Sequence, residues 1–372
     1  MEAIVLNAAN SLTNRIHSRA YRLIKPRDVV ETVIEHEVHD WEVVIEPSLG
    51  SVCHADLRYY TGQRRVEALE KKLPMALIHE GIGRIVQSQD ANLKPGQRVV
   101  IVPNIQGYLL QGTAAEYCCP ACRGEGMNYC HHGRFLGSGM DGVAQNRLVV
   151  PASCAIPVPD GVPDEIAVLA ELCSVSYQAL SHVEDQLKSA RVAVFGDGPV
   201  GYLAAAMLHY VYGVNQDRLL VFGAIPEKLA QFDFATRALV QEYDFSSEVT
   251  YDIALECTGG RFSESAINQA IDILKPGGHL ILMGVTEERV PANTRDILEK
   301  GLTLRGSSRS SISDFYPVLD AMKNPDCQQT LRKLLPSERK RITSALDFAE
   351  AMEFAAEHRS WQKVLLDFEW KL

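Results

Sequence analysis

A glycine-rich turn between two apolar segments constrains the fold of this chain more than any other feature. The apolar run 191–195 precedes three glycines spaced Gly-x-Gly-x-x-Gly, namely Gly196, Gly198 and Gly201. This order is typical of a strand, a tight turn and a helix that bind a dinucleotide pyrophosphate. Gly196 allows the turn, Gly198 lets the backbone approach the phosphates, and Gly201 allows close helix packing. We expect Asp197, inside the turn, to face solvent.

Strand-like runs alternate with helical segments after this turn. Strands are expected at 191–195, 218–222, 251–256, 278–283 and 302–305. Alternation at this spacing predicts an α/β fold with a parallel, doubly wound sheet. Residues 165–182 have a helical period, an amphipathic helix is expected after Ser311, and the terminal strand 363–368 is expected to return to the first domain.

The first part of the chain has a different pattern. Short extended runs broken by Pro and Gly begin at Tyr21 and include 41–47 and 98–103. They predict an antiparallel, barrel-like domain. A chain of 372 residues is long for a single core, so two domains are expected. Residues 1–17 are weakly patterned and are expected to form a frayed extension.

Composition excludes several classes of function. A net charge of −10 argues against a nucleic-acid partner, because phosphate backbones require a basic face. No apolar run reaches the ~18 residues of a membrane span, and the N-terminus lacks a signal-peptide pattern. Nine cysteines, an odd number, favour thiols and metal ligands over disulfides. A cytoplasmic enzyme is therefore expected.

Four side chains form a candidate metal site. Cys53, His79, Glu80 and Glu171 offer the thiolate, imidazole and carboxylates of a catalytic zinc site with room for a substrate oxygen. Zinc with one thiolate and one carboxylate is neutral, whereas both carboxylates would make the site −1 and weaken the Lewis acid. We expect one of the two glutamates to exchange with water or substrate, and the sequence leaves open which one persists. Metal and dinucleotide together indicate a zinc-dependent dehydrogenase.

The chain resembles the zinc-dependent medium-chain dehydrogenases over nearly all its length from Tyr21. Several strings are similar to the ribulose-5-phosphate reductases, also called ribitol-5-phosphate dehydrogenases: 58–62, 73–81, 102–104, 256–261, 265–269, 293–295, 299–304 and 306–310. The resemblance implies a GroES-like catalytic domain at 1–178 and 310–372 and an NADP-binding Rossmann domain at 179–309. It implies NADPH-dependent reduction of ribulose 5-phosphate to ribitol 5-phosphate, which supplies CDP-ribitol for teichoic acid or capsule polymers. A homo-oligomer and a cytidylyltransferase partner are further expectations.

One residue departs from the family pattern. Many zinc alcohol dehydrogenases carry Ser or Thr two residues after the ligand cysteine, where it relays a proton, but here Cys53 is followed by Ala55. The proton would then come from metal-bound water, a substrate hydroxyl, or the side chains of His54, Tyr59 or Tyr60. Asp56 is expected to accept a hydrogen bond from His79 and fix its tautomer.

A cysteine cluster is a second candidate metal site. The family's structural zinc lobe uses four cysteines spaced x2, x2 and x7; Cys119, Cys122 and Cys130 match the last three positions, and Glu116 stands at the first. The fourth zinc ligand would be Cys118, Glu116 or His131. The alternative is a degenerate lobe with free thiols.

The end of the second expected strand indicates which dinucleotide binds. It reads Phe222-Gly223-Ala224, without the carboxylate that would bond the ribose and repel a 2′-phosphate. We therefore favour NADPH, with Lys228 near the phosphate; the alternative is a shifted register with Asp217 or Glu227 on the ribose. The expected cofactor contacts are Gly196, Gly198, Pro199, Gly201, Gly223 and Lys228.

A sugar phosphate on an acidic protein needs a local group of cations. Arg58, Arg64 and Arg65 follow Cys53 closely, and Arg309 lies in a Gly-Ser-Ser-Arg-Ser turn. We expect Arg58, Arg64 and Arg309 to bind the substrate phosphate. Two other functions stay open: a polyol or secondary-alcohol dehydrogenase for an unphosphorylated sugar alcohol, and a catalytically silent nucleotide-binding regulator.

Overall fold

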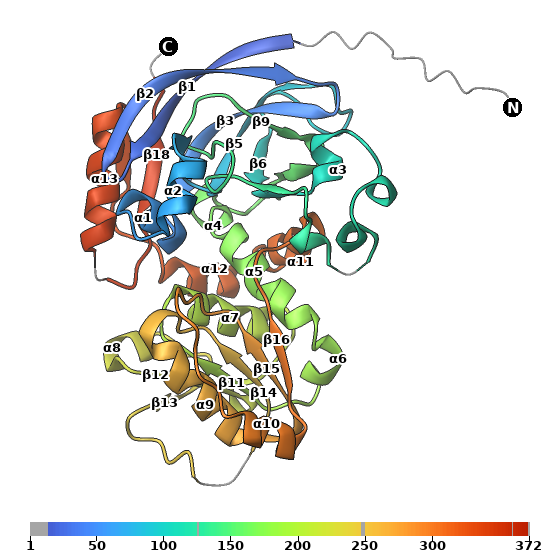
Figure 1. Ribbon diagram of the computed structural model, residues 1–372, viewed down its shortest axis with the longest axis vertical. Coiled ribbons are helices and arrows are strands. Elements are labelled where there is room, and N and C mark those ends of the chain that lie inside the picture. The colour runs from blue at the N-terminus through green and yellow to red at the C-terminus, as the bar shows by residue number, and fades with distance from the viewer. Residues whose placement is uncertain (1–13, 125, 247–249, 359, 371–372) are drawn as a thin grey trace, which may run out of the picture. The chain divides into compact units, whose positions relative to one another are not determined.

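The computed structural model describes residues 14–124, 126–246, 250–358 and 360–370. The chain forms two compact units (Figure 1). The first comprises Met1–Val158, Glu338–His358 and Val364–Leu372, and the second comprises Pro159–Ser337 and Arg359–Lys363.

A seven-stranded sheet forms the centre of the first unit. Its order is β10-β6-β5-β3-β18-β17, with β9 beside β3. The strands are β3 (Glu42–Ser51), β5 (Glu80–Ser88), β6 (Arg98–Ile101), β9 (Leu148–Pro151), β10 (Ala155–Pro157), β17 (Lys340–Ile342) and β18 (Leu365–Phe368). All pairs are antiparallel except β17 with β18. The terminal strand β18 pairs with β3, so the expected return of the chain to the first unit is confirmed.

A long hairpin covers this unit. β1 (Asn14–Lys25) pairs with β2 (Asp28–Val38), and β4 (Met75–Ala76) joins β1. Residues 14–17, expected as part of a frayed extension, are instead the beginning of β1. Ile16 packs against a small core that includes Val38, which gives this end of the strand a buried contact. The rest of that expectation, residues 1–13, lies outside the described residues.

Short helices complete the first unit. They are α1 (His54–Tyr60), α2 (Val66–Lys72), α3 (Gly107–Leu110) and α13 (Ala345–Glu357), with 3-10 turns η1 (Ala115–Tyr117), η2 (Pro120–Arg123), η3 (Met127–Tyr129) and η4 (Ala152–Cys154). A small sheet pairs β7 (Asn104–Ile105) with β8 (Arg134–Phe135). The hydroxyl of Tyr60 donates to the carbonyl of Ala349 at 3.1 Å and so joins α1 to α13.

The second unit contains a six-stranded parallel sheet in the order β13-β12-β11-β14-β15-β16. The strands are β11 (Val192–Phe195), β12 (Leu219–Gly223), β13 (Thr236–Leu239), β14 (Tyr251–Glu256), β15 (Leu274–Leu282) and β16 (Thr303–Gly306). The order reverses between β11 and β14, which is the doubly wound arrangement of a Rossmann fold. The expected parallel sheet is confirmed, and β13 is a further strand that the sequence pattern does not predict.

The helices of this unit pack against the sheet or against one another (Figure 1). They are α4 (Asp164–Ala167), α5 (Ala170–Ser181), α6 (Glu184–Leu187), α7 (Pro199–Tyr210), α8 (Pro226–Leu229), α9 (Ser263–Ile273), α10 (Thr294–Lys300), α11 (Ile312–Ala321) and α12 (Pro325–Arg332), with turns η5 (Gln216–Arg218) and η6 (Gly260–Phe262). Both α7 and α9 contact β11, whose residues are all buried. The expected helix 165–182 is divided into α4 and α5, because the N–H of Leu169 bonds to Ile166 in a tighter turn.

The contacts of α5 decide where the units divide. This helix packs against α7 and α11, both within the second unit. By compactness, residues 159–178 and 310–337 therefore belong with the Rossmann sheet, whereas the sequence-based division assigned them to the catalytic domain. The functional boundaries at 178/179 and 309/310 stay a prediction.

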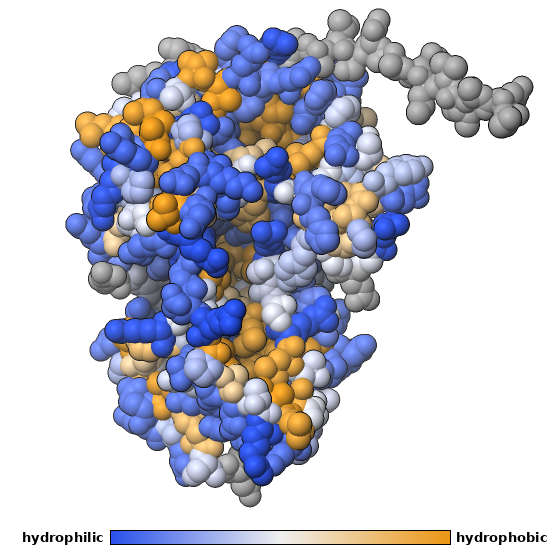
Figure 2. All heavy atoms as spheres, viewed as in Figure 1, coloured by the Kyte–Doolittle hydropathy of each residue, from blue (hydrophilic) through white to orange (hydrophobic). Residues whose placement is uncertain are grey.

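The surface of each unit is mixed in polarity. On the face in Figure 2, hydrophilic residues predominate and hydrophobic residues form separate patches. Among the described residues, no helix has the length and apolar character needed to cross a membrane.

Candidate metal centres

Three of the four expected catalytic ligands lie together in the first unit. One ligand atom each from Cys53, His79 and Glu80 lies within 4.8 Å of the other two. His79 and Glu80 are buried, and Cys53 is partly exposed. A thiolate, an imidazole and a carboxylate at this spacing form a donor set that fits zinc.

The local backbone explains why these side chains meet. Cys53 is the N-cap of α1, and its N–H donates to Oδ2 of Asp56 at 3.0 Å. The other oxygen of Asp56 accepts from the N–H of Ile78 at 3.1 Å, so this one carboxylate connects α1 to the segment that carries the histidine. Ile78 has a φ of +72°, a conformation that is strained for a β-branched residue. The strained residue directly precedes His79.

Asp56 also holds the imidazole. Nδ1 of His79 lies 3.3 Å from Oδ1 of Asp56, and both side chains are almost fully buried. A proton on Nδ1 shared with Asp56 leaves Nε2 with a lone pair for a metal. Burial disfavours the imidazolium, but the Asp56 carboxylate and the Cys53 side chain outweigh burial and hold the pKa of His79 well above its usual value. A metal that binds Nε2 would therefore displace a proton from it.

The fourth expected ligand, Glu171, belongs to the second unit. It lies in the first turn of α5 and is buried, at 4% exposure. The hydroxyl of Ser174 donates to its carbonyl oxygen at 2.6 Å. Its role as a metal ligand stays a prediction.

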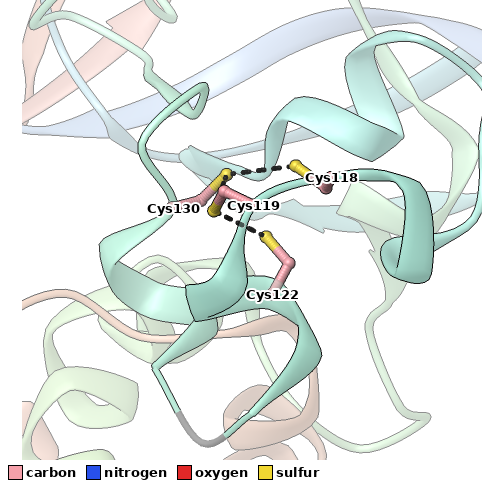
Figure 3. A group of neighbouring side chains, drawn as sticks. All are labelled: Cys118, Cys119, Cys122 and Cys130. Atoms are coloured by element: carbon pink, nitrogen blue, oxygen red, sulfur yellow. Dashed lines mark hydrogen bonds between the residues drawn. The ribbon is translucent and has the colours of Figure 1, made fainter.

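The cysteine cluster forms a second group (Figure 3). One sulfur each from Cys118, Cys119, Cys122 and Cys130 lies within 4.8 Å of the others. The sulfur–sulfur distances are 3.7 Å for Cys118–Cys130, 3.8 Å for Cys119–Cys122 and 3.9 Å for Cys119–Cys130. A tetrahedron with Zn–S bonds of about 2.3 Å has edges of about 3.8 Å. The four sulfurs therefore fit a zinc ion, with Cys118 in the place for which Glu116 and His131 were alternatives.

Backbone N–H groups support the sulfurs. A hydrogen bond from the N–H of His131 lowers the pKa of the Cys119 thiol to about 6, which favours its thiolate form. The N–H of Gly107 donates to the sulfur of Cys130 at 3.3 Å. Such contacts stabilise thiolates, which are the form of cysteine that binds metal.

The glycine turn in the second unit has the expected geometry. Gly196 has a φ of +130°, and Gly198 is the N-cap of α7, which begins at Pro199. A Cβ on Gly201 would lie 2.0 Å from the carbonyl oxygen of Gly196, whereas a Cβ on Gly198 would meet nothing within 4 Å. Gly201 is therefore required by packing, and Gly198 leaves open space at the N-terminus of a 12-residue helix, where backbone N–H groups favour anions.

Asp197 does not point freely into solvent, so that expectation is wrong. Its Oδ2 accepts from the N–H groups of Ala224 and Ile225, each at 2.8 Å. A Cβ on Gly223 would lie 2.9 Å from this oxygen, so Asp197 fills the space beside the end of β12. An Asp side chain often bonds to backbone N–H groups in turns, and that tendency is the signal in the sequence that indicates such a role.

Lys228 lies on α8, shortly after the end of β12. It is partly exposed, and in the described part of the chain it forms no ion pair with a carboxylate. Asp217, the alternative ribose partner, is in η5 and precedes β12, so it lies at the opposite end of that strand from Gly223. Glu227 is exposed in the first turn of α8.

The candidate proton donors differ in their partners. Tyr60 donates to Ala349 and to Glu353, and burial raises its pKa to about 12, so its hydroxyl is committed to α13. Tyr59 is buried and lies 2.9 Å from the hydroxyl of Ser138. His54 is exposed at the start of α1.

The expected phosphate-binding arginines are divided between the two units. Arg58 is on α1, and the guanidinium of Arg64 lies over the ring of Tyr59, 4.8 Å from its centroid. Arg309 is exposed in the second unit and has a φ of +63°. Lys72, which nothing in the sequence pattern marks as a ligand, donates to Tyr59, the residue whose ring also contacts Arg64.

Comparison with known proteins places both units among dehydrogenases. Residues 39–160 match the alcohol dehydrogenase GroES-like domain, and residues 199–324 match the zinc-binding dehydrogenase domain. The expected pairing of a GroES-like domain with a Rossmann domain is thereby confirmed.

Similar proteins extend over nearly the whole chain. Ribulose-5-phosphate reductase 1 of Staphylococcus aureus is 37% identical over 94% of this chain and 98% of its own length. The ribulose-5-phosphate reductase of Bacillus spizizenii is 37% identical over 95% of this chain and 99% of its own. The crystal structure of S. aureus TarJ in complex with NADPH superposes with a TM-score of 0.78 at 32% identity and covers 95% of this chain and 100% of that one.

Proposed function

Because the chain belongs to the zinc-binding alcohol dehydrogenase family, we propose that it reduces ribulose 5-phosphate to ribitol 5-phosphate with NADPH. Relatives 37% identical over nearly the full length of both chains carry the name ribulose-5-phosphate reductase. The observation that carries a catalytic role is the group formed by Cys53, His79 and Glu80. A regulator that only binds a nucleotide would not need these three side chains together.

Cys53, His79 and Glu80 would hold the catalytic metal, with Glu171 as a further carboxylate. When bound, zinc supplies a Lewis acid that polarises a carbonyl and favours negative charge on its oxygen. Asp56 orients His79 through Nδ1 and at the same time fixes the N-terminus of α1, where Cys53 lies. Asp56 would thus position both His79 and Cys53 as ligands of the same metal.

The glycine turn would bind the dinucleotide. NADPH supplies the hydride that reduces the ketone carbon. Gly198 leaves room for the pyrophosphate at the N-terminus of α7, and Gly201 lets that helix approach Gly196. Lys228 would pair with the 2′-phosphate. Asp197 already has two N–H partners at the end of β12 and would hold the loop there.

The cysteine cluster would bind a structural zinc ion. Its four sulfurs have the spacing of a tetrahedral site, and all protein positions around the metal would be filled. A closed site of this kind stabilises a loop and leaves no position for substrate.

An edge strand supports a homo-oligomer. β16 ends the six-stranded sheet, and its residues are exposed, as is Leu298 at 80%. Edge strands with exposed apolar neighbours tend to pair with another chain. Light scattering on the eluting protein tests this; a monomer at working concentration contradicts it.

The cysteines and the reaction product indicate the cellular compartment of the enzyme and a partner enzyme. The nine cysteines form no disulfide, which favours a reducing compartment, and we propose the cytoplasm. The ribitol 5-phosphate product would be consumed by a cytidylyltransferase, so we include that enzyme as a partner. Co-elution of the two proteins tests the association, and independent elution contradicts it.

The reaction is tested by identifying its product. The zinc-loaded protein is incubated with NADPH and ribulose 5-phosphate, and the sugar phosphates are separated by mass spectrometry. We expect ribitol 5-phosphate in amounts equal to the NADPH consumed. Reduction of ribulose without preference for the phosphorylated sugar would instead favour a polyol dehydrogenase.

A further inference from the structure

A compact group of polar side chains is formed by α1, α2 and the segment after β8, in the same unit as the catalytic metal group. The ammonium of Lys72 donates to the hydroxyl of Tyr59 at 2.7 Å and to that of Ser138 at 3.1 Å. The two hydroxyl oxygens are 2.9 Å apart. We refer to Lys72, Tyr59 and Ser138 as the Lys72 cluster. It joins α1 to α2, which lie side by side (Figure 1).

The hydrogen bonds of the Lys72 cluster leave donors available. Lys72 has three N–H donors and no acceptor, and two of them serve Tyr59 and Ser138. One of these hydroxyls donates to the other, so one hydroxyl hydrogen and one ammonium hydrogen remain for a further acceptor. A ligand rich in oxygen acceptors suits this arrangement.

The charge of the Lys72 cluster favours an anion. In the described part of the chain, Lys72 forms no ion pair with a carboxylate, and it is only partly exposed. The guanidinium of Arg64 lies 4.8 Å from the centroid of the Tyr59 ring, so a second cation is close. Two cations and two hydroxyls form the kind of donor set that binds phosphate.

Two segments connect the Lys72 cluster to the metal group. Tyr59 is on the helix whose N-cap is Cys53, and six residues of helix span about 9 Å. Ser138 follows Phe135, whose ring centroid lies 5.3 Å from that of His79. A five-carbon keto sugar has about five bonds between its ketone carbon and its phosphorus, a reach of about 6 Å. With hydrogen-bond lengths added at the phosphate end, this reach is comparable to the rise of α1 between Cys53 and Tyr59.

We propose that Lys72, with Tyr59 and Ser138, binds the phosphate of the sugar-phosphate substrate and determines its specificity. The assignment rests on the proposed function, since it presupposes a phosphorylated ketose. It adds a lysine and two hydroxyls to the arginines expected from the sequence, of which Arg64 lies against the Lys72 cluster.

The assignment is tested by replacing Lys72, with replacement of the neighbouring Lys71 as the control. Lys72→Met removes the charge, and Lys71→Met removes that of the preceding residue on α2, which is exposed. For both variants and the unaltered enzyme, kcat/KM is measured with ribulose 5-phosphate and with ribulose, together with KM for NADPH, zinc content and Tm. Inhibition by inorganic phosphate is measured against ribulose 5-phosphate.

We expect Lys72→Met to lower kcat/KM for ribulose 5-phosphate by about 10- to 100-fold, mainly through KM, because a charge-assisted hydrogen bond is lost. The rate with ribulose, the KM for NADPH and the zinc content should not change, and inhibition by phosphate should weaken. Tyr59→Phe and Ser138→Ala should act in the same direction by smaller factors. Lys71→Met should match the unaltered enzyme.

Equal losses with ribulose 5-phosphate and ribulose would overturn the assignment and would indicate that Tyr59 and Lys72 transfer a proton. An unchanged preference for the phosphorylated sugar in Lys72→Met would overturn it as well. In both cases the unaltered enzyme still reduces ribulose 5-phosphate. If the unaltered enzyme neither binds nor reduces that sugar, the proposed function is wrong. The assignment of the Lys72 cluster as a phosphate site is then wrong as well.

Discussion

Nδ1 of His79 lies 3.3 Å from Oδ1 of Asp56, and both side chains are nearly inaccessible to solvent. The same carboxylate accepts hydrogen bonds from the N–H groups of Cys53 and Ile78. Asp56 therefore orients two candidate ligands at once, one through its ring and one through the backbone that carries its sulfur. The arrangement of Cys53 and His79 therefore depends on Asp56, which is not itself one of the candidate ligands.

Asp56→Asn should weaken zinc binding by about 10- to 100-fold, because an amide accepts more weakly from Nδ1 and fixes the imidazole less firmly. Zinc affinity is measured by competition with a chelator. Asp141→Asn is the matched control, since Asp141 also bridges backbone and side chain, accepting from Ala76 at 2.7 Å and from Arg22 at 3.0 Å. If the two substitutions weaken zinc binding equally, Asp56 has no special role in orienting the metal ligands.

Glu80→Gln should abolish binding of the catalytic zinc ion, whereas Glu171→Gln should leave most of the catalytic sites occupied by zinc. The reason is that Glu80 is grouped with Cys53 and His79. Zinc content per chain, measured by elemental analysis, is expected to fall from two ions to one in Glu80→Gln. The reverse result, with zinc lost only in Glu171→Gln, would make Glu171 the persistent ligand.

Cys130→Ser should remove the zinc of the cysteine cluster and lower Tm, since a structural metal contributes its binding energy to folding. The zinc of the other site should stay. Cys327→Ala serves as the control, because Cys327 is buried in α12 and belongs to neither metal group. A Cys130→Ser protein with full zinc content would contradict a site formed by these four sulfurs.

Two glycines of the turn should respond differently to alanine. Gly201→Ala should lower Tm, because the new Cβ meets the Gly196 carbonyl oxygen at 2.0 Å. Gly198→Ala should keep Tm, because its Cβ meets nothing within 4 Å, and should raise the Kd for NADPH by crowding the pyrophosphate. Thermal unfolding and fluorescence titration separate the two effects. If Gly198→Ala binds NADPH normally, the pyrophosphate does not approach there.

The elements of the fold that depend on local sequence pattern could be predicted from the sequence. The strands around β11 follow from strand–helix alternation, and the turn at Gly196 follows from its spacing. The division of the helix at Leu169 and the strand β13 were missed, because propensity does not resolve one tighter turn or one short, partly exposed strand.

Site residues could be predicted from the sequence only where the residue type itself indicates a chemical role. Cys53, His79 and Glu80 stand out as metal ligands. Lys72 does not, because a lysine on a short helix resembles any surface lysine until Ser138, far along the chain, is placed beside it. Asp197 was misjudged for a similar reason: its partners follow the next strand of the sheet.

The most direct test of the central claim is the rate of NADPH oxidation with ribulose 5-phosphate before chelation, after chelation and after zinc is restored. Ribulose and NADH are run in parallel. We expect activity with NADPH and the phosphorylated sugar to be lost on chelation and recovered with zinc, and rates with ribulose or NADH to be much lower throughout. Activity that survives complete removal of zinc, or equal rates with ribulose, would contradict a zinc-dependent ribulose-5-phosphate reductase.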